Sequence, residues 1–329
     1  MIISRTPYRV SLFGGGTDLP AWSNDHGGEV IGFAINRYCW ISLRQLPPFF
    51  EHKHRIVWSE VETVKHWHDV KHPVVRAVMD IGGLNCGVEL HHDGDLPARS
   101  GIGSSSSFTV GLLNALHAFK GHHAEKDRLA REAIHIEREV LGENVGSQDQ
   151  IWAAYGGLNH IEFRRDGGFD VSPVIVSDER RIELETSLML FFTGFSRFSS
   201  EVAGRVTANM AARERHLHAM KAMVGEARAI LHGKSLVALG ALLHESWKLK
   251  RDLAEGVSTA EIDLIYEAGR AAGATGGKLL GAGGGGFMLF FVPQQAQKAV
   301  RDRLSSLVEV PFGIDYAGSR ISLYEPQGM

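Results

Sequence analysis

Residues 101–107 are a run of glycines and serines that leads directly into an apolar, helix-like pattern. The run is Gly101-Ile-Gly-Ser-Ser-Ser-Ser107, and the apolar residues at helical spacing are Phe108, Leu112, Leu116 and Phe119. The first turn of a helix has unpaired N–H groups and about half a positive charge. Glycines let the backbone approach a phosphate closely, and serine hydroxyls add donors or metal ligands. The segment therefore predicts a phosphate site at the start of a helix.

Other interpretations of the glycine-rich segments are open. A flexible Gly/Ser linker has a similar composition, but linkers are not followed at once by an amphipathic helix. The run also lacks the Gly-Lys-Ser/Thr of a Walker A motif. A second cluster, residues 281–286, matches Gly-x-Gly-x-x-Gly, yet the strand-like Phe287-Met-Leu-Phe-Phe follows it where a dinucleotide site requires a helix. A Rossmann site and an NAD-dependent oxidoreductase are therefore not favoured.

Three charged residues, Arg9, Glu137 and Asp149, could act beside such a site. Glu137 lies at the edge of the apolar stripe of a predicted helix, where a carboxylate needs a partner, and a metal ion is one option. A surface ion pair is the other. Asp149 lies in a Gly/Ser/Gln-rich loop, where it could be catalytic or could cap the following turn. Arg9, on a predicted strand, could equally make an ordinary salt bridge.

These residues require a framework of both strands and helices. Strands are predicted over residues 1–10, 29–43, 88–92 and 188–192, and helices over 73–81, 108–120 and 127–141. Gly121 is expected to end the helix over 108–120. The pattern after residue 195 is mainly helical, over 199–232, 235–254 and 259–272, and a glycine cluster and an apolar strand follow within 278–292. A shift in composition near 180–195 predicts two domains, residues 1–185 and 186–329.

Composition and charge exclude several classes of protein. The chain has 329 residues, 44% hydrophobic and 22% charged, as in ordinary globular proteins of about two domains. A net charge of −3 gives no global basic field for nucleic acid or anionic lipid. Two cysteines do not make a disulfide scaffold, and the apolar runs are too short to span a bilayer. No signal-peptide pattern opens the chain. We expect a cytoplasmic protein with no nucleic-acid or membrane partner.

Three segments together resemble the motifs of the GHMP kinases, the family of galactokinase, homoserine kinase, mevalonate kinase and phosphomevalonate kinase. They are residues 7–18 (Pro7-x-Arg9-x-Ser11-x-x-Gly14-Gly-Gly-Thr17-Asp18), 97–107 and 278–286, in the family's order. The resemblance spans nearly the whole chain. It implies an α+β fold of two domains, the first like domain 2 of ribosomal protein S5 and the second ferredoxin-like. It also implies an ATP-dependent kinase that uses Mg²⁺.

The resemblance implies roles for individual residues. Ser105 and Glu137 would bind Mg²⁺. Asp149 would accept or orient the proton of the acceptor hydroxyl, and Arg9 would stabilise the charge that develops. The loop over the ATP phosphates would comprise Pro97, Arg99, Ser100, Gly101, Ile102, Gly103, Ser104, Ser105, Ser106 and Ser107. Contacts to the acceptor would come from Gly14, Gly15, Gly16, Thr17, Asp18, Gly283 and Gly284.

The segment Phe13-Gly-Gly-Gly-Thr-Asp-Leu-Pro20 bears on the acceptor. Galactokinases have Gly-Glu-His-Thr-Asp, and this chain departs from that pattern at Gly15 and Gly16. The segment is similar to the heptose-phosphate kinase and fucokinase branch, as are residues 193–197 and 247–251. The resemblance implies that D-glycero-D-manno-heptose 7-phosphate is phosphorylated at its anomeric hydroxyl, for GDP-heptose and capsule or other surface polysaccharide. Candidate contacts to the 7-phosphate are Arg197, Lys248 and Arg251, although Lys248 and Arg251 could also belong to a solvated helix face.

Within the family, other functions stay open. The acceptor could be fucose or a hexose, or the chain could be a GHMP-fold binding or regulatory protein without catalysis, or a decarboxylase. The presence of Ser105, Glu137 and Asp149 favours kinase chemistry. The 17 histidines show no zinc-ligand spacing, and we expect structural or surface roles for them. A homodimer is compatible with the resemblance, which does not fix the oligomeric state.

Overall fold

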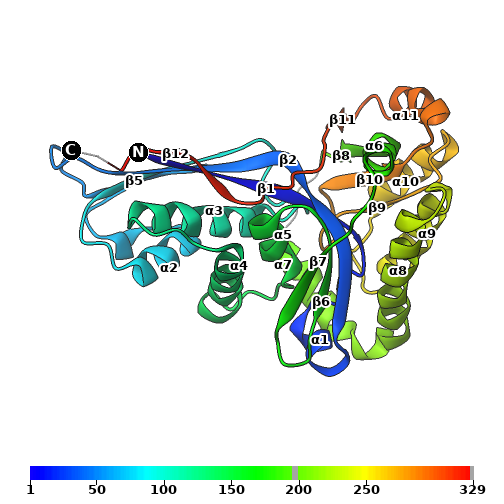
Figure 1. Cartoon of the computed structure of the whole chain (residues 1–329), viewed down its shortest axis with the longest axis horizontal. Coiled ribbons are helices and arrows are strands. Elements are labelled where there is room, and N and C mark those ends of the chain that lie inside the picture. The colour runs from blue at the N-terminus through cyan, green and yellow to red at the C-terminus, as the bar shows by residue number, and fades with distance from the viewer. Residues whose placement is uncertain (195–198, 327–329) are drawn as a thin grey trace.

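A computed structural model describes residues 1–194 and 199–326, which form two β-sheets with helices packed around them (Figure 1). Within these residues the first sheet has eight strands in the order β12-β1-β2-β5-β3-β4, and β2 also pairs with β6, which pairs with β7. Its strands are β1 (Ile2–Phe13), β2 (Gly28–Gln45), β3 (His54–Val57), β4 (Val61–Val64), β5 (Val88–Gly94), β6 (Leu158–Phe163), β7 (Phe169–Pro173) and β12 (Arg320–Tyr324). The predicted α+β class is confirmed.

The second sheet is smaller, and all of its described pairings are antiparallel. Its order is β11-β8-β10-β9. The strands are β8 (Leu188–Phe192), β9 (Gly276–Leu279), β10 (Phe287–Phe291) and β11 (Val308–Glu309). Strand β10 is buried along its whole length, as expected for the apolar run that follows the second glycine cluster.

An irregularity in the pairing of β1 with β2, with its extra residues in β2, lies next to the contact of the first sheet with the glycine–serine loop. The pairing of β1 with β2 shifts register between Pro7 and Tyr8, where proline cannot donate a ladder hydrogen bond. Two residues along, the backbone N–H of Arg9 donates to the carbonyl of Ile102 at 3.1 Å. Strand β1 thereby holds the glycine–serine loop against the first sheet.

Helices cover one face of the first sheet (Figure 1). They are α2 (Pro73–Gly82), α3 (Ser104–Phe119), α4 (Lys126–His135) and α5 (Gln148–Tyr155), and a π-helical turn, Ile136–Val140, follows α4. Helix α3 packs closely on β1 at Gly111, where a Cβ atom would lie 2.9 Å from Thr6 Oγ1. Gly121 follows the end of this helix in the left-handed region, as predicted (φ +75°). The predicted start at residue 108 is wrong by four residues, because α3 already includes the serines.

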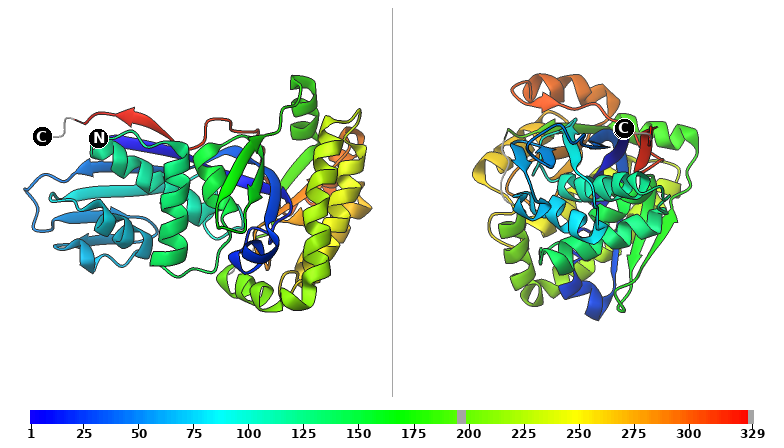
Figure 2. Two further views of the ribbon diagram at one scale, coloured as in Figure 1. Left: turned by 60° about the horizontal axis from the view of Figure 1, so that its bottom comes forward. Right: turned by 90° about the vertical axis from the view of Figure 1, so that its left-hand side faces the viewer.

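The helices of the second half lie around the smaller sheet, and Figure 2 shows α8 beside α9. The helix predicted over 199–232 is divided at residues 210–213 by a single 3₁₀ turn. The helices are α6 (Asp178–Ser187), α7 (Ser199–Asn209), α8 (Glu214–His232), α9 (Val237–Arg251), α10 (Ala260–Ala271) and α11 (Gln297–Arg303), while α1 (Pro20–His26) belongs to the first half. Short 3₁₀ turns occupy Trp67–Asp69, Ala211–Arg213 and Gln294–Ala296.

The end of the chain returns to its beginning. Strand β12 pairs with β1 in the first sheet, although the predicted boundary assigns residues 186–329 to the second domain. Cys39 is buried and Cys86 is half-buried, and both are free thiols. Among the helices of the described segments, none combines the length and the apolar character that a bilayer span requires.

Candidate active site

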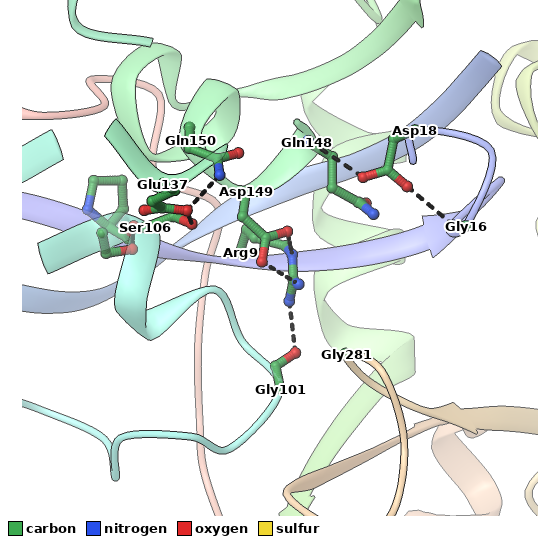
Figure 3. A network of polar contacts seen from close by, with 12 residues as sticks. Arg9, Gly16, Asp18, Gly101, Ser106, Glu137, Gln148, Asp149, Gln150 and Gly281 are labelled. Atoms are coloured by element: carbon green, nitrogen blue, oxygen red, sulfur yellow. Dashed lines mark hydrogen bonds and ion pairs between the residues drawn. The ribbon is translucent and has the colours of Figure 1, made fainter. Parts of the chain in front are cut away.

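The side chain of Arg9 joins three elements at the centre of the molecule (Figure 3). Its Nε and Nη2 atoms donate to the two carboxylate oxygens of Asp149 at 2.7 and 2.8 Å. Its Nη1 atom donates to the carbonyl of Gly101 at 2.6 Å. Arg9 comes from β1, Asp149 from the first turn of α5 and Gly101 from the loop before α3. A bidentate guanidinium–carboxylate pair is strong and directional, so it fixes the carboxylate relative to the loop.

A second aspartate lies next to this pair. Asp18 is 3% exposed, and it accepts hydrogen bonds from the backbone N–H groups of Gly16 (3.0 Å) and Gln148 (3.4 Å). Burial, and then the charge of Asp149, raise the pKa of Asp18 above its ordinary value. A Cβ atom at Gly146 would lie 1.8 Å from Asp18 Oδ2, so this approach requires glycine. The carboxyl groups of Asp18 and Asp149 therefore lie in the same site, where both could accept hydrogen bonds from hydroxyl groups.

The glycine loop that carries Asp18 is held by its own backbone and by Thr17. A Cβ atom at Gly14 would lie 1.9 Å from the carbonyl oxygen of Glu29. The buried Thr17 hydroxyl donates to the carbonyl of Gly14 at 2.8 Å and accepts from the N–H of Glu29 at 3.0 Å. Gly16 has a φ of +99°, which favours glycine. The predicted substrate segment is thus a fixed turn beside Asp149.

Glu137 lies in the π-helical turn after α4, which is buried at this point. Its Oε2 accepts from the Ser106 hydroxyl at 2.9 Å and from the side-chain amide of Gln150. Its Oε1 is buried and has no hydrogen-bond partner of good geometry among the described residues, although the Thr109 hydroxyl also lowers the pKa of this carboxyl. Burial raises the pKa of Glu137 to about 7. A half-satisfied buried carboxylate beside a hydroxyl fits a hard cation such as Mg²⁺.

The structure brings Ser106 to Glu137, whereas the sequence analysis assigned the metal-binding hydroxyl to Ser105. Ser105 is exposed, one position away on the first turn of α3. Ser107 points inward and donates to the carbonyl of Pro7 at 2.8 Å. The Ser104 hydroxyl accepts from the N–H of Arg99 at 3.1 Å. Ser104 and Ser105 therefore line the open side of the turn, and Ser106 and Ser107 line its buried side.

The loop before α3 is shaped by glycines in the left-handed region. Gly101 and Gly103 have φ angles of +79° and +74°. A Cβ atom at Gly103 would lie 3.3 Å from Asp149 Oδ2 and 3.2 Å from Arg9 Cγ. Arg99 also has a positive φ, of 58°, which is rare for a residue with a side chain. The glycines thus leave room for the Arg9–Asp149 pair directly under the loop.

The second glycine cluster touches this loop backbone to backbone. A Cβ atom at Gly281 would lie 2.4 Å from the Cα atom of Gly101. The N–H of Phe287 donates to the carbonyl of Ser100 at 3.2 Å, which links β10 to the loop. Gly283 and Gly284, predicted to contact substrate, are buried against Val257, and Gly284 N–H donates to its carbonyl at 3.0 Å. Their backbone therefore packs between elements of the second half.

The predicted cationic contacts to a substrate phosphate have different surroundings. Lys248 is exposed and pairs with Glu245 at 3.1 Å, and Arg251 pairs with Asp263 at 3.1 Å. Arg251 also lines a cavity of about 500 Å³ between α7 and the end of α9. Arg197 lies outside the described residues. The structure does not bring Lys248 to the Arg9–Asp149 pair.

Lys250 and Lys278, for which the sequence predicts no role, lie behind the two glycine-rich loops. Lys250 Nζ donates to the carbonyls of Leu279 and Gly281 at 2.7 and 2.6 Å, and Lys278 Nζ donates to the carbonyl of Leu12 at 2.8 Å. A signal for Lys250 was present, since it continues the buried stripe of α9 at helical spacing, after Leu239, Leu243 and Trp247. Lys278 gave no such signal, because it is buried in a short strand.

Comparison with known proteins gives consistent relatives. Residues 69–157 match the GHMP kinases N terminal domain, and residues 223–309 match the GHMP kinases C terminal domain. The chain is 31% identical over 303 residues to a D-glycero-alpha-D-manno-heptose 7-phosphate kinase of Campylobacter jejuni, covering 88% of this chain and 89% of that protein. It is 26% identical to a galactokinase of Thermotoga maritima, over 94% of this chain and 95% of that protein.

Solved structures agree on the fold. A D-glycero-D-manno-heptose 1-phosphate kinase from Bacteroides thetaiotaomicron superposes with a TM-score of 0.81 at 23% identity, covering 99% of this chain and 100% of that one. A galactokinase of Lactococcus lactis in complex with galactose superposes with a TM-score of 0.75 at 18% identity, over 97% and 94% of the two chains. The two-domain architecture is therefore shared with both structures.

Proposed function

The chain belongs to the GHMP kinase family and is an ATP-dependent sugar kinase, and from this we propose that its acceptor is D-glycero-D-manno-heptose 7-phosphate. The reaction would phosphorylate the anomeric hydroxyl and give the 1,7-bisphosphate, a precursor for GDP-heptose and surface polysaccharide. The observation that carries the proposal is the bidentate Arg9–Asp149 pair, held against Gly101 of the predicted phosphate loop and beside Asp18.

The arrangement supports a direct transfer. The acceptor hydroxyl oxygen forms a bond to the γ-phosphorus of ATP, while the bond from that phosphorus to the bridging oxygen of ADP breaks. The hydroxyl proton passes to the carboxylate of Asp149. Asp149 is 25% exposed even though Arg9 donates to both of its oxygens, so acceptor capacity remains on the open side. Arg9 positions the carboxylate and adds positive charge where negative charge develops.

Backbone groups at the start of α3 and the hydroxyls of Ser104 and Ser105 would bind the ATP phosphates, on the open side of the turn. Glu137 and Ser106 would hold Mg²⁺, because Glu137 Oε1 otherwise has no hydrogen-bond partner of good geometry among the described residues. When bound there, Mg²⁺ supplies positive charge that offsets the charge of the phosphates. The same carboxylate keeps the serine turn of α3 fixed against the π-helical turn.

The acceptor loop differs from that of galactokinases at Gly15 and Gly16. A Cβ atom at Gly15 would lie 3.5 Å from the Ser11 hydroxyl and 3.8 Å from Gln148 Nε2, so a side chain there would point toward the Asp18 side of the site. Glycine at positions 15 and 16 leaves that space free. The similarity to the heptose 7-phosphate kinase of Campylobacter jejuni extends over most of both chains. The identity of 31%, against 26% to the galactokinase of Thermotoga maritima, favours a heptose phosphate over galactose.

A fucose or hexose kinase is the second candidate, because the chain is also 25% identical to a bifunctional fucokinase of Arabidopsis thaliana, over 92% of this chain and 31% of that protein. An ADP-release assay with heptose 7-phosphate, heptose, fucose, galactose and mannose separates the candidates. We expect release chiefly with the 7-phosphate, and ³¹P NMR of the product should show a new anomeric phosphate. If ADP were released with an unphosphorylated sugar but not with heptose 7-phosphate, the proposed acceptor would be rejected and the kinase assignment would stay intact.

A further inference from the structure

Lys250 and Lys278 lie together behind the two glycine loops. Lys250 reaches from the last turn of α9 and donates to the backbone carbonyls of Leu279 and Gly281. Lys278, on β9, is 3% exposed and donates to the carbonyl of Leu12 on β1. The three cations lie close together, because Lys278 adjoins Leu279, an acceptor of Lys250. Gly281, the other acceptor of Lys250, touches Gly101, whose carbonyl accepts from Arg9. One strand from each sheet and helix α9 thus deliver positive charge to one place.

The positive charges of Lys250 and Lys278 are not balanced by carboxylates of the described residues. Arg9 is paired with Asp149, but among residues 1–194 and 199–326 no carboxylate forms an ion pair with Lys250 or Lys278. Each ammonium has three donors, and the described carbonyls use two on Lys250 and one on Lys278. Burial lowers the pKa of Lys278 to about 7 and that of Lys250 below its usual range. Buried cations without a counter-ion are costly unless a ligand supplies the negative charge.

The position of the cluster indicates which part of the site it serves. Lys250 holds Gly281, and Gly281 touches Gly101. Gly101 accepts from Arg9, whose other nitrogens bind Asp149 (Figure 3). The cluster is therefore next to the point where the phosphate loop and the catalytic pair meet. Lys248, two residues before Lys250 on α9, faces solvent instead.

We infer that Lys250 and Lys278, with Arg9, form a cationic subsite for a phosphoryl group at the junction of the two glycine loops. The inference rests on the proposed function and assigns to Lys250 a phosphate contact for which the sequence suggests Arg197, Lys248 and Arg251. The ligand is either the terminal phosphoryl of ATP or the phosphate carried by the acceptor. Both present the same chemistry to the ammonium groups, a tetrahedral anion with three free oxygens.

Calorimetric titration of the full chain with Mg²⁺–ATP, Mg²⁺–ADP, heptose and heptose 7-phosphate tests the inference. The variants are Lys250→Met, Lys250→Arg and the control Lys298→Met, whose lysine is 88% exposed on α11. A charged hydrogen bond of this kind contributes about 10- to 100-fold in affinity. We expect Lys250→Met to lose about that much for one phosphorylated ligand, Lys250→Arg to recover part of it, and Lys298→Met to bind like the unchanged protein.

The arms identify the source of the phosphoryl group. Loss for ATP but not for ADP assigns the subsite to the terminal phosphoryl, and loss for heptose 7-phosphate but not for heptose assigns it to the acceptor. Equal loss for all ligands would mean that Lys250 only supports the glycine loop, which overturns the inference. So would unchanged binding of every ligand by Lys250→Met. The nucleotide arms remain informative if no heptose binds, so failure of the proposed acceptor is distinguishable from failure of the subsite.

Discussion

At the scale of single residues, the pair of Arg9 and Asp149 determines what the site can do. Arg9 donates to both oxygens of Asp149 and to the loop carbonyl of Gly101, so the carboxylate cannot turn away from the phosphate loop. A fixed carboxylate near a bound hydroxyl is suited to accept its proton. The neighbouring Asp18 is held by backbone N–H groups, and it is therefore suited to bind sugar hydroxyls.

The substitution Asp149→Asn tests this division of roles. An amide has nearly the same shape but cannot accept the proton, and general-base catalysis is typically worth about 10²–10⁴-fold in rate. We expect kcat to fall by about that factor, while the affinity for ATP stays within about threefold. Stopped-time ADP assays and nucleotide titration measure the two quantities. Asp166→Asn, on an exposed turn, is the control. Normal turnover in folded Asp149→Asn protein would show that the carboxylate is not the base.

Substitutions of the two neighbouring serines of α3 should affect metal binding differently. Ser106 donates to Glu137 at 2.9 Å, whereas Ser105 is exposed on the same turn. Loss of a group that binds or orients a metal ligand typically costs about 10- to 100-fold in metal affinity. We expect Ser106→Ala to raise the Mg²⁺ concentration for half-maximal rate by at least about tenfold, and Ser105→Ala to raise it less. The reverse order in a magnesium titration would return the role to Ser105.

The resemblance to the family's motifs predicts site roles for Arg9, Asp149 and Glu137, because those motifs are local in sequence, whereas residue types alone leave an ion pair or a capping role open for each. Lys250 was not selected, although the cluster of cations in residues 247–251 was. Three positive charges in five residues do not show which one faces inward, because the apolar stripe of α9 leads from Trp247 to position 250 and to position 251 alike. The partners of Lys278 lie on β1, more than 260 positions away, and no local pattern contains them.

At the scale of elements, the start of α3 and the π-helical turn show where periodicity fails. Apolar spacing begins at Phe108, but the helix begins at Ser104 because a polar first turn carries no hydrophobic signal. The π-helical turn Ile136–Val140 interrupts a pattern that predicts one continuous helix over 127–141. Such turns are frequent at functional sites, and this one presents Glu137 to Ser106.

Helix α2 supplies a pH-dependent contribution to stability. His72 caps this helix, stacks on Phe108 with ring centroids 4.7 Å apart, and has a pKa that burial lowers to about 4. In the unfolded chain its pKa is about 6.5, so between pH 6.5 and 4 the unfolded state binds the extra proton. The contribution is therefore fully present above pH 6.5 and is lost as the pH falls toward 4.

We expect this loss to amount to about 1–2 kcal/mol between pH 7 and pH 5. The variant His72→Asn keeps a capping side chain and removes the titration, so its free energy of unfolding should depend less on pH than that of the unchanged protein. Urea denaturation at the two pH values measures the difference. His123→Asn, on an 86% exposed side chain, is the control. Equal pH dependence in the unchanged protein and in His72→Asn would contradict the assignment.

At the scale of the whole molecule, pairings between distant segments complete both the sheet and the site. Strand β12 pairs with β1, although more than 300 positions separate them in the sequence. The alternation of polar and apolar residues in 320–324 does not reveal which strand β12 joins. The two glycine clusters are 180 positions apart at Gly101 and Gly281, yet they touch. Sequence motifs predicted that both belong to the site, but only the fold shows that they contact each other.

Contact between Gly101 and Gly281 leads to a prediction about how the two halves cooperate. A Cβ atom at position 281 would lie 2.4 Å from the Cα atom of Gly101, so Gly281→Ala must separate the loops. Displacement of a reacting group by about 1 Å can cost 10²-fold in rate. We expect kcat/KM for ATP to fall by about that factor, with circular dichroism unchanged.

Gly121→Ala is a matched control for this substitution, because Gly121 has nearly the same φ as Gly281 (+75° against +69°) but no atom within 4 Å of its Cβ position. It carries the backbone strain of a left-handed alanine, about 1 kcal/mol, without the collision. Gly281→Ala should therefore lose more stability in thermal denaturation than Gly121→Ala, and only Gly281→Ala should lose activity. If the two variants retained equal activity, the catalytic geometry would not depend on the contact between the glycine loops.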